Sequence, residues 1–119
     1  MPQITVGSQA PFEVASGTRL VNALEDQGID ILHRCGGNAR CTTCRVEFQA
    51  GEPSTITKAE SFKLAEAKLT GVRLACQISC EADMQLQPLM TLSDSGLPDP
   101  GPRPADSITP EPEWLERPL

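Results

Sequence analysis

The stretch HRCGGNARCTTCRVEF, residues 33–48, places three cysteines within ten positions of one another. These are Cys35, Cys41 and Cys44, and mostly small residues separate them: Gly36, Gly37, Asn38, Ala39, Arg40, Thr42 and Thr43. A packed core requires larger apolar side chains, and a reducing compartment gives no reason to close a loop with disulfides. The stretch therefore predicts a loop whose thiolates bind a ligand that the backbone wraps closely.

Beyond this loop, the chain alternates strand and helix signals toward its C-terminus. Thr57-Lys-Ala-Glu60 is a capping box, in which the Thr hydroxyl and the Glu carboxylate each satisfy an amide of the first helical turn. It predicts a helix over residues 58–69 that Gly71 ends. Three segments indicate strands: RVEFQ (45–49), VRLACQISC (72–80) and MQLQPL (84–89).

The segment before the loop predicts a hairpin and a helix. Two β-prone runs, QITV (3–6) and PFEVA (11–15), flank a turn at Gly7-Ser8. Ser16-Gly17-Thr18 then offers a helix cap, and apolar residues at helical spacing from Leu20 onward predict a helix that stops at Gly28. This order of elements favours an α+β fold, in which one main helix packs across a mixed sheet.

The chain changes character after Met90. Its last 27 residues hold seven prolines, and six acids against two arginines give this segment a charge of −4 out of the net −6. Such a segment prefers extended conformations and has little to bury. We therefore expect a domain over residues 1–92 and a Pro-rich acidic tail over residues 93–119. The tail is either a disordered leash or a segment that lies against the domain or a partner through Trp114 and Leu115.

Composition excludes several classes of function. The acidic balance argues against nucleic acid as a partner. No signal peptide is visible, and no apolar segment approaches the roughly 18 residues that would insert into a membrane. Five cysteines, an odd number, cannot form a complete disulfide framework. We expect a cytoplasmic monomer.

The cysteines form two groups, one in the loop and one at Cys76 and Cys80. Four ligands close either a zinc site or an iron–sulfur cluster, so the number of thiols leaves both open. Zinc sites favour two separated close pairs, which the Cys-x5-Cys-x2-Cys run does not provide. A thiol oxidoreductase using Cys41-Thr-Thr-Cys44 is a third reading, but the motif runs into a strand instead of a helix.

At CGGNARCTTC (35–44) and RLACQ (73–77) the chain resembles the [2Fe-2S] ferredoxins with five residues between the first two cysteines, the bacterial and adrenodoxin-like spacing. The resemblance covers about residues 3–89. It implies a β-grasp fold and a [2Fe-2S] cluster bound by Cys35, Cys41, Cys44 and Cys76. It also implies an electron carrier without enzymatic activity, which takes one electron from a reductase and passes it to an acceptor. A redox-sensing module that signals through its tail is the alternative use of the cluster.

Residues near the four predicted ligands also suggest roles. The small loop residues let backbone N–H groups reach the sulfurs, so Gly37→Val should weaken cluster retention. Cys80 is either a small buried residue of a strand or a substitute ligand or redox sensor. His33 is expected to be solvent-exposed near the cluster. The neighbouring arginines are either solvated or compensate the cluster's charge: Arg34, Arg40, Arg45 and Arg73.

Overall fold

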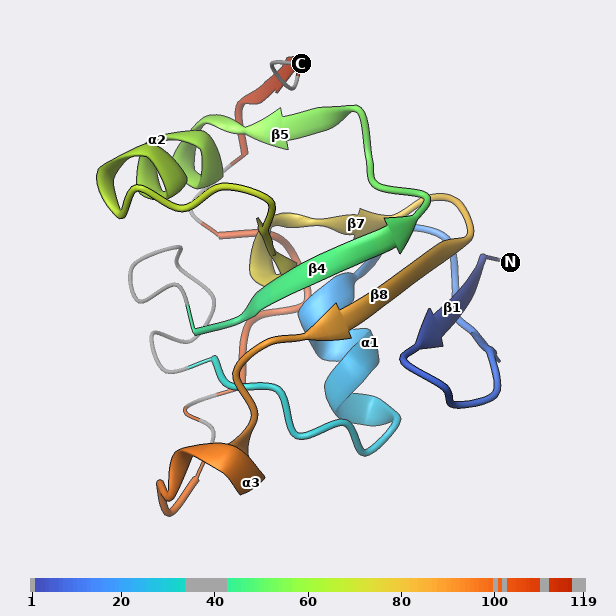
Figure 1. The fold of residues 1–119 in the computed structure, drawn as a ribbon. Helices are drawn as coiled ribbons and strands as arrows, with labels where there is room; N and C mark the ends of the chain where they lie inside the picture. The colour runs from blue at the N-terminus through green and yellow to red at the C-terminus, as the bar shows by residue number, and fades with distance from the viewer. Residues whose placement is uncertain (1, 34–42, 100, 102, 110–111, 117–119) are drawn as a thin grey trace.

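The computed structural model describes residues 2–33, 43–99, 101, 103–109 and 112–116, and its centre is a mixed five-stranded sheet (Figure 1). The strands lie side by side in the order β2-β1-β8-β4-β6. β1 and β8 run parallel, and the other neighbouring pairs run antiparallel. Their bounds are β1 (Gln3–Val6), β2 (Phe12–Glu13), β4 (Arg45–Ala50), β6 (Arg73–Leu74) and β8 (Met84–Pro88). The predicted α+β fold with a mixed sheet is confirmed.

The central strand β8 shows why these residues form a sheet with one buried face. Met84 and Leu86 are buried while Gln85 is exposed, which is the two-residue period of a strand packed on one side. In the register of the sheet, Ile4 of β1 lies opposite Met84, and Phe48 of β4 lies opposite Leu86. The apolar side chains of three strands therefore meet on the same face.

Helix α1 (Leu20–Asp26) supplies much of the core that covers this face, because its first five residues are all buried. The predicted end is confirmed, since the Gly28 amide donates to the Glu25 carbonyl at 3.0 Å and Gly28 has a φ of +80°. The predicted cap is wrong: the helix begins after Arg19 without a side-chain cap. Thr18 and Arg19 form strand β3 and pair with β7 (Ser79–Cys80), which keeps their backbone extended.

Helix α2 (Lys58–Glu66) is much less buried than α1, and Glu60 is its buried residue. The predicted cap is confirmed, because the Thr57 hydroxyl accepts a hydrogen bond from the Glu60 amide at 3.1 Å. The second half of the capping box is wrong, since the Glu60 carboxylate turns inward and accepts from the Leu74 amide at 2.7 Å. Glu60 therefore anchors the helix to the sheet.

The predicted strand over residues 72–80 is interrupted by a single 3-10 turn. β6 ends at Leu74, η1 (Ala75–Gln77) follows, and β7 resumes the extended backbone. We call residues 73–77 the Cys76 turn. A short helix α3 (Leu92–Ser95) follows β8.

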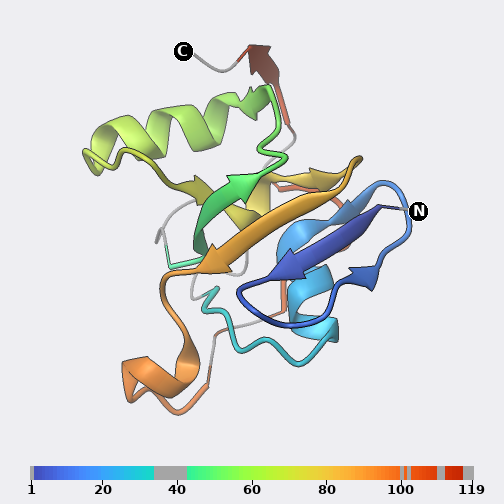
Figure 2. The same ribbon diagram turned by 45° about the vertical axis from the view of Figure 1, so that its right-hand side comes forward.

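The described part of the tail lies against the domain. Strand β9 (Trp114–Glu116) pairs antiparallel with β5 (Thr55–Thr57), beside the start of α2 (Figure 2). The Lys58 amide also donates to the Glu113 carbonyl at 2.8 Å. Of the two readings of the tail, the structure supports the docked one for these residues.

Candidate metal centre

Two of the four predicted ligands, Cys44 and Cys76, lie in the described part of the chain, whereas Cys35 and Cys41 lie outside the described residues. Cys44 directly precedes β4, and Cys76 lies in η1, directly after β6. These strands pair antiparallel, with Arg45 opposite Leu74, and the Ala75 amide donates to the Cys44 carbonyl at 3.0 Å. The pairing therefore brings two cysteines that are distant in sequence to the same end of neighbouring strands.

Both cysteines are almost completely buried, with 2% of Cys44 and none of Cys76 exposed. The amide nitrogen Nε2 of Gln77 lies 3.6 Å from the Cys76 Sγ, within reach of a hydrogen bond to sulfur. A thiolate that binds a metal in a buried site needs such donors, because burial disfavours its negative charge. The burial and the donor fit a cysteine that serves as a metal or cluster ligand.

The described residues alone do not complete a metal site. Among them, no group of three or more histidine, cysteine or acidic side chains gathers in a way that could hold a metal ion. Cys44 and Cys76 are two of the four predicted ligands, and the prediction of a complete site depends on Cys35 and Cys41 as well. The prediction for Gly37, and those for Arg34 and Arg40, also fall on residues outside the described part.

The chain is anchored where it leads into the cysteine loop. Ile31 forms an isolated β-bridge with Thr91, and the Leu32 amide donates to the Met90 carbonyl at 3.1 Å. The Leu92 amide donates to the Asp30 carbonyl at 2.7 Å. The fold thus fixes the residues before the loop as well as Cys44 at its end.

His33 is buried, so the expectation of a solvent-exposed side chain is wrong. Only 1% of the residue is exposed, and its Nε2 lies 3.1 Å from the Glu25 Oε2. The cause is the preceding segment, since Ile31 and Leu32 are buried and carry His33 inward. The side chain then meets Glu25 near the end of α1.

Arg73 is not a solvated surface residue, because only 3% of it is exposed. Its Nε lies 2.8 Å from the Glu60 Oε2, and its Nη1 lies 3.3 Å from the Glu52 Oε2. Burial works against the charge of the guanidinium, but the hydrogen bonds and attraction to Glu60 outweigh it and raise the pKa of Arg73. Its charge is matched locally by carboxylates, which limits its use for compensating a cluster. Arg45 is partly exposed.

Cys80 is fully buried in β7, as the strand reading predicted. Burial, assisted by the nearby Glu81 charge, raises the pKa of this thiol to about 12. The thiol is therefore neutral over the physiological range, which disfavours both nucleophilic and ligand chemistry in the folded protein.

Two buried residues beside Cys76, Gln77 and Arg19, received no role from the sequence patterns. The Arg19 Nε donates to the Cys76 carbonyl at 2.7 Å. The signal for Gln77 was its position in RLACQ, next to a predicted ligand. Arg19 gave no comparable signal, because its contact is with the backbone of a residue far along the chain.

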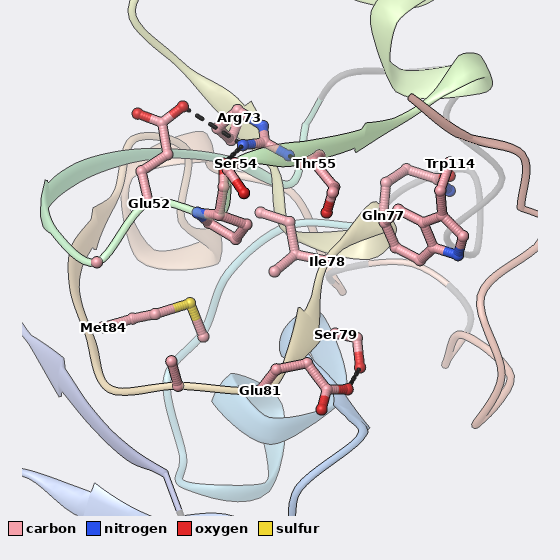
Figure 3. A pocket seen from close by; sticks show the side chains of 13 residues that line it. Glu52, Ser54, Thr55, Arg73, Gln77, Ile78, Ser79, Glu81, Met84 and Trp114 are labelled. Carbon is pink, nitrogen blue, oxygen red and sulfur yellow. Dashed lines mark hydrogen bonds and ion pairs between the residues drawn. The ribbon is translucent and has the colours of Figure 1, made fainter. Parts of the chain in front are cut away.

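A pocket of about 730 Å³ is lined in part by residues of the Cys76 turn and of the strand that follows it (Figure 3). Arg73 and Gln77 line it together with Met84 and Trp114, and neither Cys44 nor Cys76 does. Ser79 and Glu81 close one side, with a hydrogen bond of 2.6 Å from the Ser79 hydroxyl to Glu81. The pocket therefore contacts residues adjacent to Cys76 in sequence but does not expose the thiols of Cys44 and Cys76.

Comparison of the sequence with known protein families finds a match. A family model described as a 2Fe-2S iron-sulfur cluster binding domain matches residues 4–81. One curated relative is the F component of the Na(+)-translocating NADH-quinone reductase of Pseudoalteromonas atlantica. It is 38% identical over 72 residues, which are 60% of this chain and 17% of that protein. The chain thus spans about a fifth or less of the length of the first curated relatives it matches.

The fold is also similar to those of solved structures. The ISC-like [2Fe-2S] ferredoxin of Pseudomonas putida has a TM-score of 0.61 and 25% identity, over 73% of this chain and 91% of that chain. A putidaredoxin in a covalent complex with its reductase has a TM-score of 0.54 and 25% identity, over 72% and 96% of the two chains. No helix in the described part of the chain is long and apolar enough to cross a membrane.

Proposed function

The chain belongs to the family of 2Fe-2S iron-sulfur cluster binding domains, and from this premise we propose that it works as a one-electron carrier. Its domain is a ferredoxin-type electron transfer domain with a [2Fe-2S] cluster as cofactor. The support for the carrier is the likeness to a solved [2Fe-2S] ferredoxin, 91% of whose chain is covered with a TM-score of 0.61. The carrier has no substrate chemistry of its own.

Cys35, Cys41, Cys44 and Cys76 are the ligands in this proposal. The observation that carries it is the position of Cys44 and Cys76, which are both buried and joined through the Ala75 amide at the end of β4 and β6. The cluster supplies reversible uptake of a single electron. The protein contributes thiolates, a buried environment that limits water, and the donor of Gln77 beside one sulfur.

A reductase and an acceptor are the partners in this proposal. The putidaredoxin neighbour was solved in a complex with its reductase, and the similarity covers 72% of this chain and 96% of that one. We place the carrier in the cytoplasm, since a reducing compartment keeps the ligand thiols available. A flavoprotein ferredoxin reductase with its nicotinamide, and cytochrome c as acceptor, gives a direct test. The rate of cytochrome c reduction should rise in proportion to the amount of added chain.

The ligand set is tested by spectra of anaerobically purified variants. Cys35→Ser, Cys41→Ser, Cys44→Ser and Cys76→Ser should each abolish the absorption and electron paramagnetic resonance signals of the cluster. Cys80→Ser is the matched control and should retain them, because Cys80 is a neutral thiol within β7. A colourless, iron-free parent protein would contradict the whole proposal and favour the zinc reading. A normal spectrum from Cys76→Ser would remove only that ligand.

A redox sensor is the second candidate, favoured by one contact between the tail and the centre: the Gln77 Nε2 donates to the Thr109 carbonyl at 2.7 Å. Signalling through the tail predicts that reduction changes how the tail packs. Limited proteolysis of oxidised and reduced protein measures this directly. Different cleavage rates in the tail support the sensor, and equal rates together with rapid turnover support the carrier.

A further inference from the structure

The segment from 103 to 109, which we call the strap, packs against the Cys76 turn although it lies beyond the residues that the family model matches. Arg19 holds it from one side, with its Nη1 donating to the carbonyls of Ala105 at 2.8 Å and Ser107 at 3.2 Å. The Asn22 Nδ2 donates to the carbonyls of Pro104 at 3.1 Å and Ala105 at 3.2 Å. Arg19 and Asn22 are both buried, so these contacts are partly shielded from water although Ala105 and Ser107 are exposed.

The strap meets the Cys76 turn at Gln77, whose side chain is fully buried. The two hydrogens of its amide nitrogen are directed to the Thr109 carbonyl at 2.7 Å and the Cys76 Sγ at 3.6 Å. Its amide oxygen accepts a hydrogen bond from the Thr57 hydroxyl at 2.8 Å. Three neighbours from separate parts of the chain therefore fix one amide group.

The chemistry of these neighbours determines which end of the amide faces the sulfur. A carbonyl oxygen such as that of Thr109 can only accept, so it requires the nitrogen of Gln77 on its side. The opposite orientation would place two oxygens against each other and would direct an oxygen lone pair at the thiolate. Thr109 thus selects the orientation in which Cys76 receives a donor.

We propose that Gln77 is a positioning residue for the cluster, and that the strap keeps its amide oriented so that it donates to the Cys76 sulfur. The inference rests on the proposed role of Cys76 as a ligand. A hydrogen bond to a cluster sulfur stabilises the more negative, reduced state and raises the reduction potential. Through Gln77, a segment outside the family match influences the cluster without contributing a ligand.

The first test compares Gln77→Met with Gln87→Met in the full chain. Methionine keeps the length of the side chain but has no donor, and Gln87 is exposed on β8, so Gln87→Met is a matched control. Gln77→Met should lower the reduction potential and speed the loss of iron to a chelator by about 10- to 100-fold. If Gln77→Met does not fold, Gln77→Leu is the second variant, because it also removes the donor without burying a charge and should lower the potential in the same direction.

The second test uses a double-mutant cycle to connect the strap to Gln77. Asn22→Leu removes two hydrogen bonds to the strap and has no described contact with Cys76. It should lower the potential by less than Gln77→Met does, and it should add nothing in the Gln77→Met background. Fully additive shifts would contradict the role of the strap.

The outcomes separate this inference from the proposed function. If the parent and Gln77→Met both hold a normal cluster with the same potential and the same rate of iron loss, the positioning role is wrong and the carrier proposal stands. If the parent holds no cluster, the carrier proposal fails first. A lowered potential in Gln77→Met with an unchanged midpoint of urea unfolding supports positioning over a purely structural role.

Discussion

The Cys76 turn has two ends, and the protein fastens them with different chemistry. At the first end, Arg73 and the Leu74 amide are bound by the carboxylate of Glu60, which α2 places in the interior. At the second end, the Cys76 carbonyl and the Gln77 amide are bound by Arg19 and by the Thr109 carbonyl. The first end is held by a buried ion pair, and the second by hydrogen bonds that involve backbone carbonyls.

This difference suggests that the two ends of the Cys76 turn affect different properties, the stability of the fold and the properties of the metal centre. A buried carboxylate and guanidinium are expensive to separate, because whichever charge remains would be buried without its partner. Each hydrogen bond to a backbone carbonyl contributes less, and several must be lost before the segment detaches. We therefore expect the first end to determine whether the domain stays folded and the second end to tune the centre within a folded domain.

The largest effect is expected at the first end, from Glu60→Gln. It should destabilise the protein by about 3–5 kcal/mol, since Arg73 keeps its buried charge and loses its main carboxylate. Urea unfolding followed by circular dichroism measures this loss. Glu66→Gln is the matched control on the same helix, because Glu66 is exposed and pairs with Lys63 at the surface. A loss below about 1 kcal/mol for Glu60→Gln would remove the distinction between the two ends.

The second prediction concerns alkaline pH and the strand that follows the Cys76 turn. Burial raises the pKa of Cys80 from its ordinary value of 9.0 to about 12, so the unfolded chain releases this proton first. Stability should therefore fall as pH rises from 9 toward 12, by about 1.4 kcal/mol per unit from this group. Unfolding midpoints across this range measure the slope, and Cys80→Ala should lack this part of it. Equal slopes in both proteins would contradict the buried neutral thiol.

A smaller effect is expected from Thr57→Val, which touches both ends at once. Thr57 accepts from the Glu60 amide and donates to the Gln77 side chain. Valine keeps the shape but makes neither bond, so we expect a loss of about 1–2 kcal/mol in the free energy of unfolding. Thr55→Val, at an exposed position of the same strand, is the control. If both variants lose the same stability, Thr57 does not link the two ends.

The smallest effect is expected from Arg103→Ala at the start of the strap. Its Nη1 lies 2.9 Å from the Asp26 Oδ1, but 46% and 57% of the two side chains are exposed. Exposed pairs of this kind contribute about 0.5 kcal/mol or less and weaken with salt. Unfolding at low and high salt measures the contribution. A loss as large as that of Thr57→Val would show that charge also holds the second end.

Much of the fold could be predicted because it follows from local patterns. The hairpin of β1 and β2, the alternation in β4 and β8, and the stop at Gly28 each depend on neighbouring residues. The cap of α1 could not be predicted. Thr18 and Arg19 stay extended because they pair with β7, which lies far along the chain.

The candidate site likewise has parts that the sequence could predict and parts that it could not. The motif around RLACQ predicts Cys76 as a ligand, and the structure buries Cys76 and Cys44 at the same end of paired strands. The burial of Arg73 could not be predicted from sequence, because it depends on the carboxylate of Glu60, which α2 supplies. The contact of the buried His33 with Glu25 of α1 was equally beyond local patterns. The contacts of Arg19 and Gln77 with the strap could not be predicted either, because local patterns left open whether the Pro-rich segment is disordered or docked, and pointed only to Trp114 and Leu115 as contacts.

The position of β8 has a consequence for how the protein is made. β8 is the middle strand of the sheet, between β1 near the N-terminus and β4, yet it is the last of the five strands to leave the ribosome. Before residue 88 is synthesised, β1 and β4 lack their common neighbour, although all five cysteines have already been translated. The cysteine thiols of the nascent chain are therefore exposed to metals and oxidants until β8 joins the sheet. A fragment that ended with the family match at residue 81 would never leave that vulnerable stage.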